Sequence, residues 1–223
     1  MGVKEAYKKV WGQFYTPKVK ISSLASNGLV NSLVDNSPFE YKFLNSLAIP
    51  LHRKQFKRVK NDLFARYTKV LVAWARDGQQ LSHWIIDGGK HLTQARSGED
   101  EKRTKKKDDF RAKANAMRIK IDSNPSEVTS KDRKLYNKTY CQGCVERPDW
   151  LHRALYQFFD TFNQQHPHIN IKVTCEVALG ESDPRLARLL QHPTFHFIVA
   201  DDQDIPLYCT WCASCDGDQV GIS

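Results

Sequence analysis

The sequence predicts an α/β protein with a three-layered, mostly parallel sheet. Apolar stretches of strand length alternate along the chain with amphipathic stretches of helix length, which is typical of parallel strand–helix–strand units. The 223 residues are enough for one sizeable domain, and a hydrophobic content of 40% supplies its core. We therefore expect a single domain over residues 1–223, without internal repeats.

Four short stretches have the character of strands. Residues 18–22 ("KVKIS") alternate apolar and polar side chains, as a half-buried strand does. The stretch "LSHWIID" is a nearly continuous apolar run followed by two glycines, which indicates a strand buried on both faces. Two later stretches, "INIKVTCEV" and "FHFIVADD", lead into acidic residues. The predicted strands lie near residues 18–22, 82–87, 169–175 and 195–200.

Helical periodicity separates these strands. The clearest pattern runs over residues 52–78, where apolar residues recur every three or four positions until Gly78 ends the helix. Residues 183–192 begin with an Asp-Pro pair, as helix starts often do. Residues 121–148 are predicted to form a loop. Residues 96–148 together are then expected to form a basic helical arch or loop that extends from the core. Further helices are expected over residues 5–15, 37–47, 99–120 and 149–165.

Charge is distributed unevenly along the chain, whose formal net charge is +9. Residues 1–148 carry 30 Lys and Arg against 15 Asp and Glu, whereas residues 149–223 carry 4 against 10. A basic first part and an acidic second part suit a protein that binds a polyanion and also binds cations. A basic balance that serves solubility alone is the simpler alternative.

Membrane and secretion signals are missing from the sequence. No stretch approaches the ~18 apolar residues of a membrane span. The first residues, "MGVKEAYKKV", lack the apolar core of a signal peptide. We expect an intracellular protein without membrane contact, in which the six cysteines stay reduced.

Acidic residues follow three of the predicted strands. Asp87 ends one strand, Glu181 and Asp183 follow another, and Asp202 and Asp204 follow a third. The carboxyl ends of parallel strands lie at one edge of the sheet, where unpaired carboxylates would repel each other. Mg²⁺ and Mn²⁺ prefer such oxygen ligands, and two of these ions can promote attack of water on a phosphodiester. One acidic strand end is usually only a cap or a turn, but three together predict a metal site.

Two Cys-x-x-Cys pairs are the other possible metal ligands. One pair lies in "CQGC" and the other in "CTWCASC". Four thiolates can close a structural zinc site, although the separation of these pairs is longer than a compact zinc ribbon allows. Free or redox-active thiols are the alternative. The candidate zinc ligands are Cys141, Cys144, Cys209 and Cys212.

Five motifs along the chain match one known family in their order. "MGVK" is similar to the Met-Gly start of the flap endonuclease, XPG and Xrn superfamily of 5′ nucleases, and "WIIDG" resembles its second acidic motif. "RSGEDEKR" is similar to the stretch that enters the helical arch of flap endonucleases. "EVALGESDPRLARLL" resembles the Glu-Ala-Pro-x-Glu-Ala-Glu-Ala box, and "VADDQDIPLYC" resembles the Thr-Glu-Asp-x-Asp box. The resemblance spans nearly the whole chain and implies a PIN-like fold.

The resemblance also implies roles for the acidic residues. Asp87, Glu181 and Asp183 would hold or support a first Mg²⁺ or Mn²⁺. Asp202 and Asp204 would hold a second. The implied activity is metal-dependent cleavage of DNA or RNA phosphodiesters at 5′ ends or flaps.

Basic residues complete the implied site. Arg96 and Arg103 match the family's basic pair that contacts the scissile phosphate, so we count both among the catalytic residues. Between residues 96 and 120 there are 10 Lys and Arg against 5 Asp and Glu, which fits a surface that binds a phosphate backbone. A solvated helix face is the plainer interpretation of this segment alone. The predicted nucleic-acid-binding residues are Arg96, Lys102, Arg103, Lys105, Lys106, Lys107, Arg111 and Lys113.

The sequence departs from the family pattern at two places. The family's first strand ends in a metal-binding Asp, whereas the matching stretch here, "VKISSLASNGL", has Ser22 at that position, and Asp35 lies too far along for a simple alignment. The chain also stops soon after Asp204, where the family continues with a further acid and a helical duplex-binding module. Asp216 and Asp218 are poor substitutes for that acid. These departures predict a weakened two-metal site.

Three functions are therefore compatible with the sequence. The first is a metal-dependent nuclease. The second is a catalytically degenerate family member that binds nucleic acid or protein partners, which Ser22 and the early C-terminus favour. The third is an unrelated zinc-stabilised nucleic-acid-binding protein, in which the cysteines matter and the acids do not. DNA and RNA are equally compatible with all three.

Overall fold

The structure is a computed structural model that describes residues 20–88, 97–180 and 182–201. For residues 97–100, 102 and 103 it describes the backbone alone. The chain divides into two compact units. Among the described residues, the first unit contains 20–39, 68–88 and 152–201, and the second contains 40–67 and 97–151.

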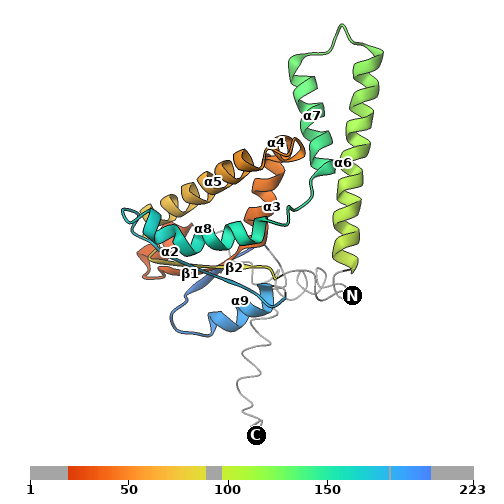
Figure 1. The fold of residues 1–223 in the computed structure, drawn as a ribbon. Coiled ribbons are helices and arrows are strands. Elements are labelled where there is room, and N and C mark those ends of the chain that lie inside the picture. Colours follow the sequence, from red (N-terminus) through yellow and green to blue (C-terminus); the bar gives the residue numbers. More distant parts are fainter. Residues whose placement is uncertain (1–19, 89–96, 181, 202–223) are drawn as a thin grey trace. The chain divides into compact units, whose positions relative to one another are not determined.

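A four-stranded, all-parallel sheet forms the centre of the first unit (Figure 1). The strands are β1 (Asn31–Asp35), β2 (Leu81–Ile86), β3 (Lys172–Val177) and β4 (Phe197–Val199), in the spatial order β3-β2-β1-β4. In register, Val34 of β1 lies between Trp84 of β2 and Val199 of β4. The predicted parallel α/β sheet is confirmed, and three of its four strands lie close to their predicted positions.

The first strand is not where the sequence analysis placed it. The stretch predicted as a strand near 18–22 runs into helix α2 (Ile21–Ser26), and β1 begins only at Asn31 after Gly28, whose φ is +79°. An alternating stretch suits a strand with one wet face, whereas β1 is a central strand with Leu33 and Val34 both fully buried. The short apolar run "NSLVD" is therefore the better strand.

Helices cover both faces of this sheet. On one face Trp84 stacks against Phe159 of α8 (Leu151–Gln165) and against Trp74 of α5 (Phe56–Arg76), with ring centroids 4.7 and 5.6 Å apart. On the other face Leu186 of α9 (Ser182–Leu190) packs in a buried cluster with Leu33, Ile85 and Ala178. Figure 1 shows α8 and α9 on opposite sides of the sheet. The first unit thus has the three layers that the sequence predicts.

Two further helices follow β1 directly. They are α3 (Asn36–Ser46) and α4 (Ala48–His52), and the long α5 comes next. Gly78 lies two residues after the end of α5, where the sequence predicts that the helix stops, and its φ is +94°. Residues with a Cβ rarely adopt this conformation, so glycine suits the turn that ends the helix.

A helical hairpin dominates the second unit (Figure 1). Helix α6 (Ser97–Ser123) packs against α7 (Ser130–Cys144), and Gly143 allows a close approach to α6 beside Lys107 and Arg111. The predicted helix over 99–120 is confirmed, but the predicted loop over 121–148 is wrong for the fifteen residues of α7. The pattern Thr129-x-x-Asp132 was the missed signal, since it forms a capping box at the start of α7.

Candidate metal site and cationic hairpin

Two carboxylates lie at the carboxyl ends of adjacent strands. Asp35 is the last residue of β1 and is buried, with only 4% of its surface exposed. Asp87 directly follows β2 and is half-buried. Because β1 and β2 are parallel neighbours, both residues emerge at the same edge of the sheet.

Two serines link these carboxylates. Ser37 donates its backbone N–H to Asp35 Oδ1 over 3.0 Å and its hydroxyl to Asp87 Oδ2 over 2.7 Å. Ser182 donates its hydroxyl to Asp35 Oδ1 over 3.0 Å and its backbone N–H to Asp87 Oδ1, also over 3.0 Å. Each aspartate therefore accepts one hydrogen bond from each serine, and the four residues form a closed polar cluster.

A close backbone approach brings Ser182 to this cluster. After the strands end, Ala178 N–H donates to Ile86 O over 2.9 Å and Gly88 N–H donates to Gly180 O over 3.0 Å. A Cβ on Gly88 would lie 1.7 Å from the carbonyl oxygen of Ala178, so this position requires glycine. The extended pairing holds the start of α9 beside Asp87.

Asp35 is the functional candidate that the sequence analysis missed. Ser22 is an exposed residue of α2, so the expectation that it occupies the end of the first strand is wrong. The residue at that end is Asp35. The signal was present in the sequence, because "SLVD" and "WIID" are both apolar runs closed by an aspartate.

The other predicted acids are partly outside the described residues. Asp183 is the second residue of α9 and directly follows Ser182. Glu181, Asp202 and Asp204 lie outside the part that the structure describes, as does Arg96. Convergence of all five predicted carboxylates on one pocket thus stays a prediction. Among the described residues, no group of three or more Asp, Glu, His or Cys side chains is arranged to hold an ion.

The residues present nevertheless suit a divalent cation with oxygen ligands. Two carboxylates and two hydroxyls share one small volume, and Asp87 forms no ion pair with a described residue. Mg²⁺ and Mn²⁺ favour this donor set. The simpler role for the aspartates is helix capping, since Asp35 precedes α3 and Asp87 accepts from the first residue of α9. Capping explains the backbone bonds but not the serine hydroxyls that join the two acids.

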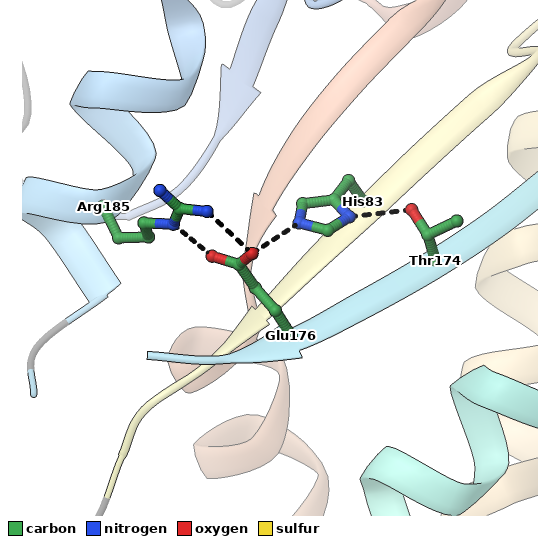
Figure 2. Close-up of polar contacts among 4 residues, drawn as sticks. All are labelled: His83, Thr174, Glu176 and Arg185. Carbon is green, nitrogen blue, oxygen red and sulfur yellow. Dashed lines mark hydrogen bonds and ion pairs between the residues drawn. The ribbon is translucent and has the colours of Figure 1, made fainter. Parts of the chain in front are cut away.

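A second polar group lies on the sheet face that α9 covers (Figure 2). Arg185 of α9 donates from Nε and Nη2 to the two carboxylate oxygens of Glu176 on β3. His83 on β2 places Nε2 3.7 Å from Glu176 Oε2 and Nδ1 2.7 Å from Thr174 Oγ1. The hydrogen bond from Arg185 lowers the pKa of Glu176, and burial lowers the pKa of His83. The sequence analysis did not identify this group.

The hairpin carries the predicted cationic surface. Lys105, Lys106, Arg111 and Lys113 are exposed and Lys107 is half-buried, whereas the side chains of Lys102 and Arg103 are outside the described set. Among the described side chains, Arg111 bonds Asp108 over 3.0 Å and Arg118 lies 3.5 Å from Asp122, both within α6. The Lys106 ammonium lies over the Tyr41 ring, 4.7 Å from its centroid. Helix α7 adds four exposed cations that the sequence analysis left unassigned: Lys131, Arg133, Lys134 and Lys138.

The cysteines of the hairpin are thiols. Cys141 is buried and Cys144 half-buried near the end of α7, and both are free. Burial raises the pKa of Cys141, which makes it a poor nucleophile. Cys209 and Cys212 lie outside the described residues, so the zinc site stays a prediction. On β3, burial raises the pKa of the free thiol of Cys175 to about 12.

Comparison with protein-family models and with curated proteins gives no match for this chain. Among the helices that the structure describes, none combines the length and apolar character needed to cross a bilayer.

Proposed function

We propose that the chain is a divalent-metal-dependent nuclease that cleaves DNA or RNA phosphodiesters at 5′ ends or flaps. The observation that carries this proposal is the Asp35–Asp87 pair at the ends of adjacent parallel strands, joined through two serines. Asp183 would contribute to the same site, together with Glu181, Asp202 and Asp204, which follow β3 and β4 in the sequence. Bound Mg²⁺ or Mn²⁺ would lower the pKa of a water and stabilise the leaving oxygen.

The protein's own contribution is the placement of oxygen ligands. Ser37 and Ser182 hold the two carboxylates in one orientation, since each serine bonds both of them. Such partners of metal ligands commonly change metal affinity or activity by about 10–100-fold when they are removed. The serines therefore support the proposal as much as the acids do.

The hairpin would bind the substrate's phosphate backbone. Clustered Lys and Arg displace condensed counterions from a polyanion, which gives affinity without sequence preference. DNA and RNA both present this backbone, so the cations of α6 and α7 suit either. Protein partners are not needed for this role.

Cleavage is a better proposal than binding alone. One of the two grounds for a binding-only protein was a serine at the end of the first strand. Because β1 ends in Asp35, that argument no longer holds. A zinc-stabilised binding protein would leave unexplained the serine hydroxyls that join the two carboxylates.

The test is cleavage of labelled single-stranded and flap substrates in Mg²⁺ or Mn²⁺. Asp35→Ala and Asp87→Ala should each lower the rate on the order of 10³-fold, because metal stabilisation of developing charge is worth several kcal/mol. Asp77→Ala is the matched control, since Asp77 is exposed and its loss changes the net charge equally. Failure of the unaltered protein to cut with either ion, or full activity of both site variants, would refute the proposal.

A further inference from the structure

The polar group around Glu176 connects three elements of the first unit. His83 belongs to β2, Glu176 and Thr174 to β3, and Arg185 to α9 (Figure 2). The Arg185–Glu176 contact is a two-point contact, in which Nε and Nη2 each donate to a different carboxylate oxygen. Such fork-to-fork pairs fix direction as well as distance.

Arg185 lies close along α9 to the residue that bonds both aspartates. It follows Ser182 by three positions, which is less than one helical turn. Ser182 begins α9 and donates to Asp35 and Asp87. A rotation or shift of α9 that broke the Arg185 contact would therefore also move Ser182 against the two acids.

Apolar packing alone does not fix this position. Leu186 is fully buried and packs against Leu33, Ile85 and Ala178. Such burial holds a helix on a sheet, but it is non-directional and permits small rotations and shifts. Directional polar contacts add to this packing, and among those described for α9 the Arg185–Glu176 contact has two donors in one rigid fork.

We propose that Arg185, held by Glu176 and supported by His83, is a positioning residue for the metal site. It fixes the first turn of α9, and with it Ser182 and Asp183, against Asp35 and Asp87. The inference rests on the proposed metal-dependent function and gives that site a positioning contact less than one turn along α9 from Ser182. Arg185 touches neither aspartate and is not a catalytic residue.

A merely structural ion pair would behave differently on substitution. The Arg185 side chain is 41% exposed and that of Glu176 28%, so loss of the pair should change the urea midpoint little. A positioning role predicts instead a loss of metal affinity and of turnover. Because the hairpin would carry most of the substrate affinity, KM should stay nearly constant while kcat falls.

The experiment uses the full chain and Mn²⁺ as the probe. Arg185→Gln should weaken Mn²⁺ binding about 10–100-fold and lower kcat by a similar factor. Arg185→Lys keeps the charge but loses the fork, and should recover only part of the affinity. Arg188→Gln is the matched control, because Arg188 lies on the same helix and is exposed, and it should stay within about twofold of the unaltered protein.

A double substitution distinguishes an effect of the Arg185–Glu176 pair from an effect of the neighbouring residues. If Arg185 acts through Glu176, then Arg185→Gln combined with Glu176→Gln should be no worse than Arg185→Gln alone. Equal Mn²⁺ affinity in Arg185→Gln and Arg188→Gln would overturn the positioning role and leave the proposed function intact. Absence of Mn²⁺ binding and cleavage in the unaltered chain would overturn both. If Arg185→Gln does not fold, Arg185→Lys and Glu176→Gln decide, and failure of these to fold as well would make the pair structural.

Discussion

The carboxylate cluster and the α6–α7 hairpin hold their charges in opposite ways. Asp35 is almost completely buried and accepts hydrogen bonds from Ser37 and Ser182 at defined atoms. Most hairpin cations with described side chains are exposed, and two of them pair with acids on the same helix, as Arg118 does with Asp122 over 3.5 Å. A buried charge is tolerated only when it is satisfied, whereas an exposed charge costs little.

This difference determines how each region should respond to change. The geometry of the carboxylate cluster depends on individual hydrogen bonds, so a single substitution there should have a large effect on stability or metal affinity. Nucleic-acid binding by the hairpin should depend on its total charge. Single substitutions there should therefore change the affinity little, and combined substitutions should lower it in steps. Paired substitutions in the two regions test this contrast directly.

The largest expected effect is at Gly88, one of two glycines that permit close approaches. Gly88→Ala would place a Cβ 1.7 Å from a backbone oxygen, which cannot move without separating the ends of β2 and β3. We expect a loss of about 3 kcal/mol or more in the free energy of unfolding. Urea unfolding followed by tryptophan fluorescence, to which the buried Trp74 and Trp84 contribute, measures it, and Mn²⁺ affinity should fall in parallel.

Gly143→Ala is the counterpart in the hairpin. Its Cβ would lie 2.8 Å from Arg111 Cγ, in a flexible side chain that can give way, and 3.2 Å from the nearest backbone atoms. The helix-forming preference of Ala offsets part of the strain, so we expect a net change of only about 0–1 kcal/mol. Equal destabilisation by the two substitutions would contradict the contrast between the regions.

The second prediction concerns the hairpin's total charge. Replacing Lys105, Lys106 and Lys107 together with Ala should weaken nucleic-acid binding and lower the slope of affinity against salt by about one unit for each phosphate that is no longer neutralised. Cleavage by saturated enzyme should change little. Fluorescence anisotropy at several salt concentrations measures the slope. An unchanged slope would mean that these lysines form only a solvated helix face.

The sequence predicted buried strands better than exposed helices. Residues 82–86 were predicted as a strand because a strand buried on both faces is a short apolar run, and Trp84, Ile85 and Ile86 are all fully buried. Helix α7 was missed because its few apolar residues leave no strong stripe, and packing along α6 stabilises it. Local alternation placed the first strand too early, since the sequence does not show which stretch pairs with β2.

Only part of the candidate site was predicted, because that prediction also depended on where the strands were placed. Asp87 was identified because it closes an obvious strand. Asp35 was missed because its strand was misplaced, although the same rule applies to it. The serine links join residues 37 and 87, and 35 and 182, and no local pattern in the sequence indicates such contacts.

The third prediction is a difference in pH dependence between the two regions. Burial lowers the folded-state pKa of His83 below its ordinary 6.5, so the unfolded chain binds the proton more readily. The stability of the first unit should therefore decrease as pH falls below 6.5, until His83 is protonated in the folded state as well. Glu176, whose pKa Arg185 lowers from 4.5, adds a further loss below that value.

The hairpin should lose stability only in stronger acid. Hydrogen bonding to Thr129 lowers the pKa of Asp132 from 3.8, so this contribution is complete above 3.8 and is lost as pH falls below it. Urea unfolding of the unaltered protein and of His83→Gln between pH 7 and 5 isolates the histidine. The variant should show the shallower dependence on pH, and identical slopes would exclude His83 as the group responsible.

The smallest expected effect is at the start of α7. Thr129 Oγ1 accepts a hydrogen bond from the backbone N–H of Asp132 over 3.2 Å, and the Asp132 carboxylate accepts one from the backbone N–H of Thr129 over 2.9 Å. Thr129→Ala removes the first of these hydrogen bonds and also the one that the Thr129 hydroxyl donates to the Asp132 carboxylate over 2.6 Å. The loss should cost about 1 kcal/mol, which fraying of the first turn absorbs. The amide of Asp132 should then exchange its hydrogen about 5-fold faster, whereas Thr129→Ser should leave it protected. Mn²⁺ affinity should not change, because the proposed metal ligands Asp35 and Asp87 lie in the other unit. Loss of metal affinity on Thr129→Ala would show that hairpin and carboxylate cluster are energetically coupled, and would break the contrast between them.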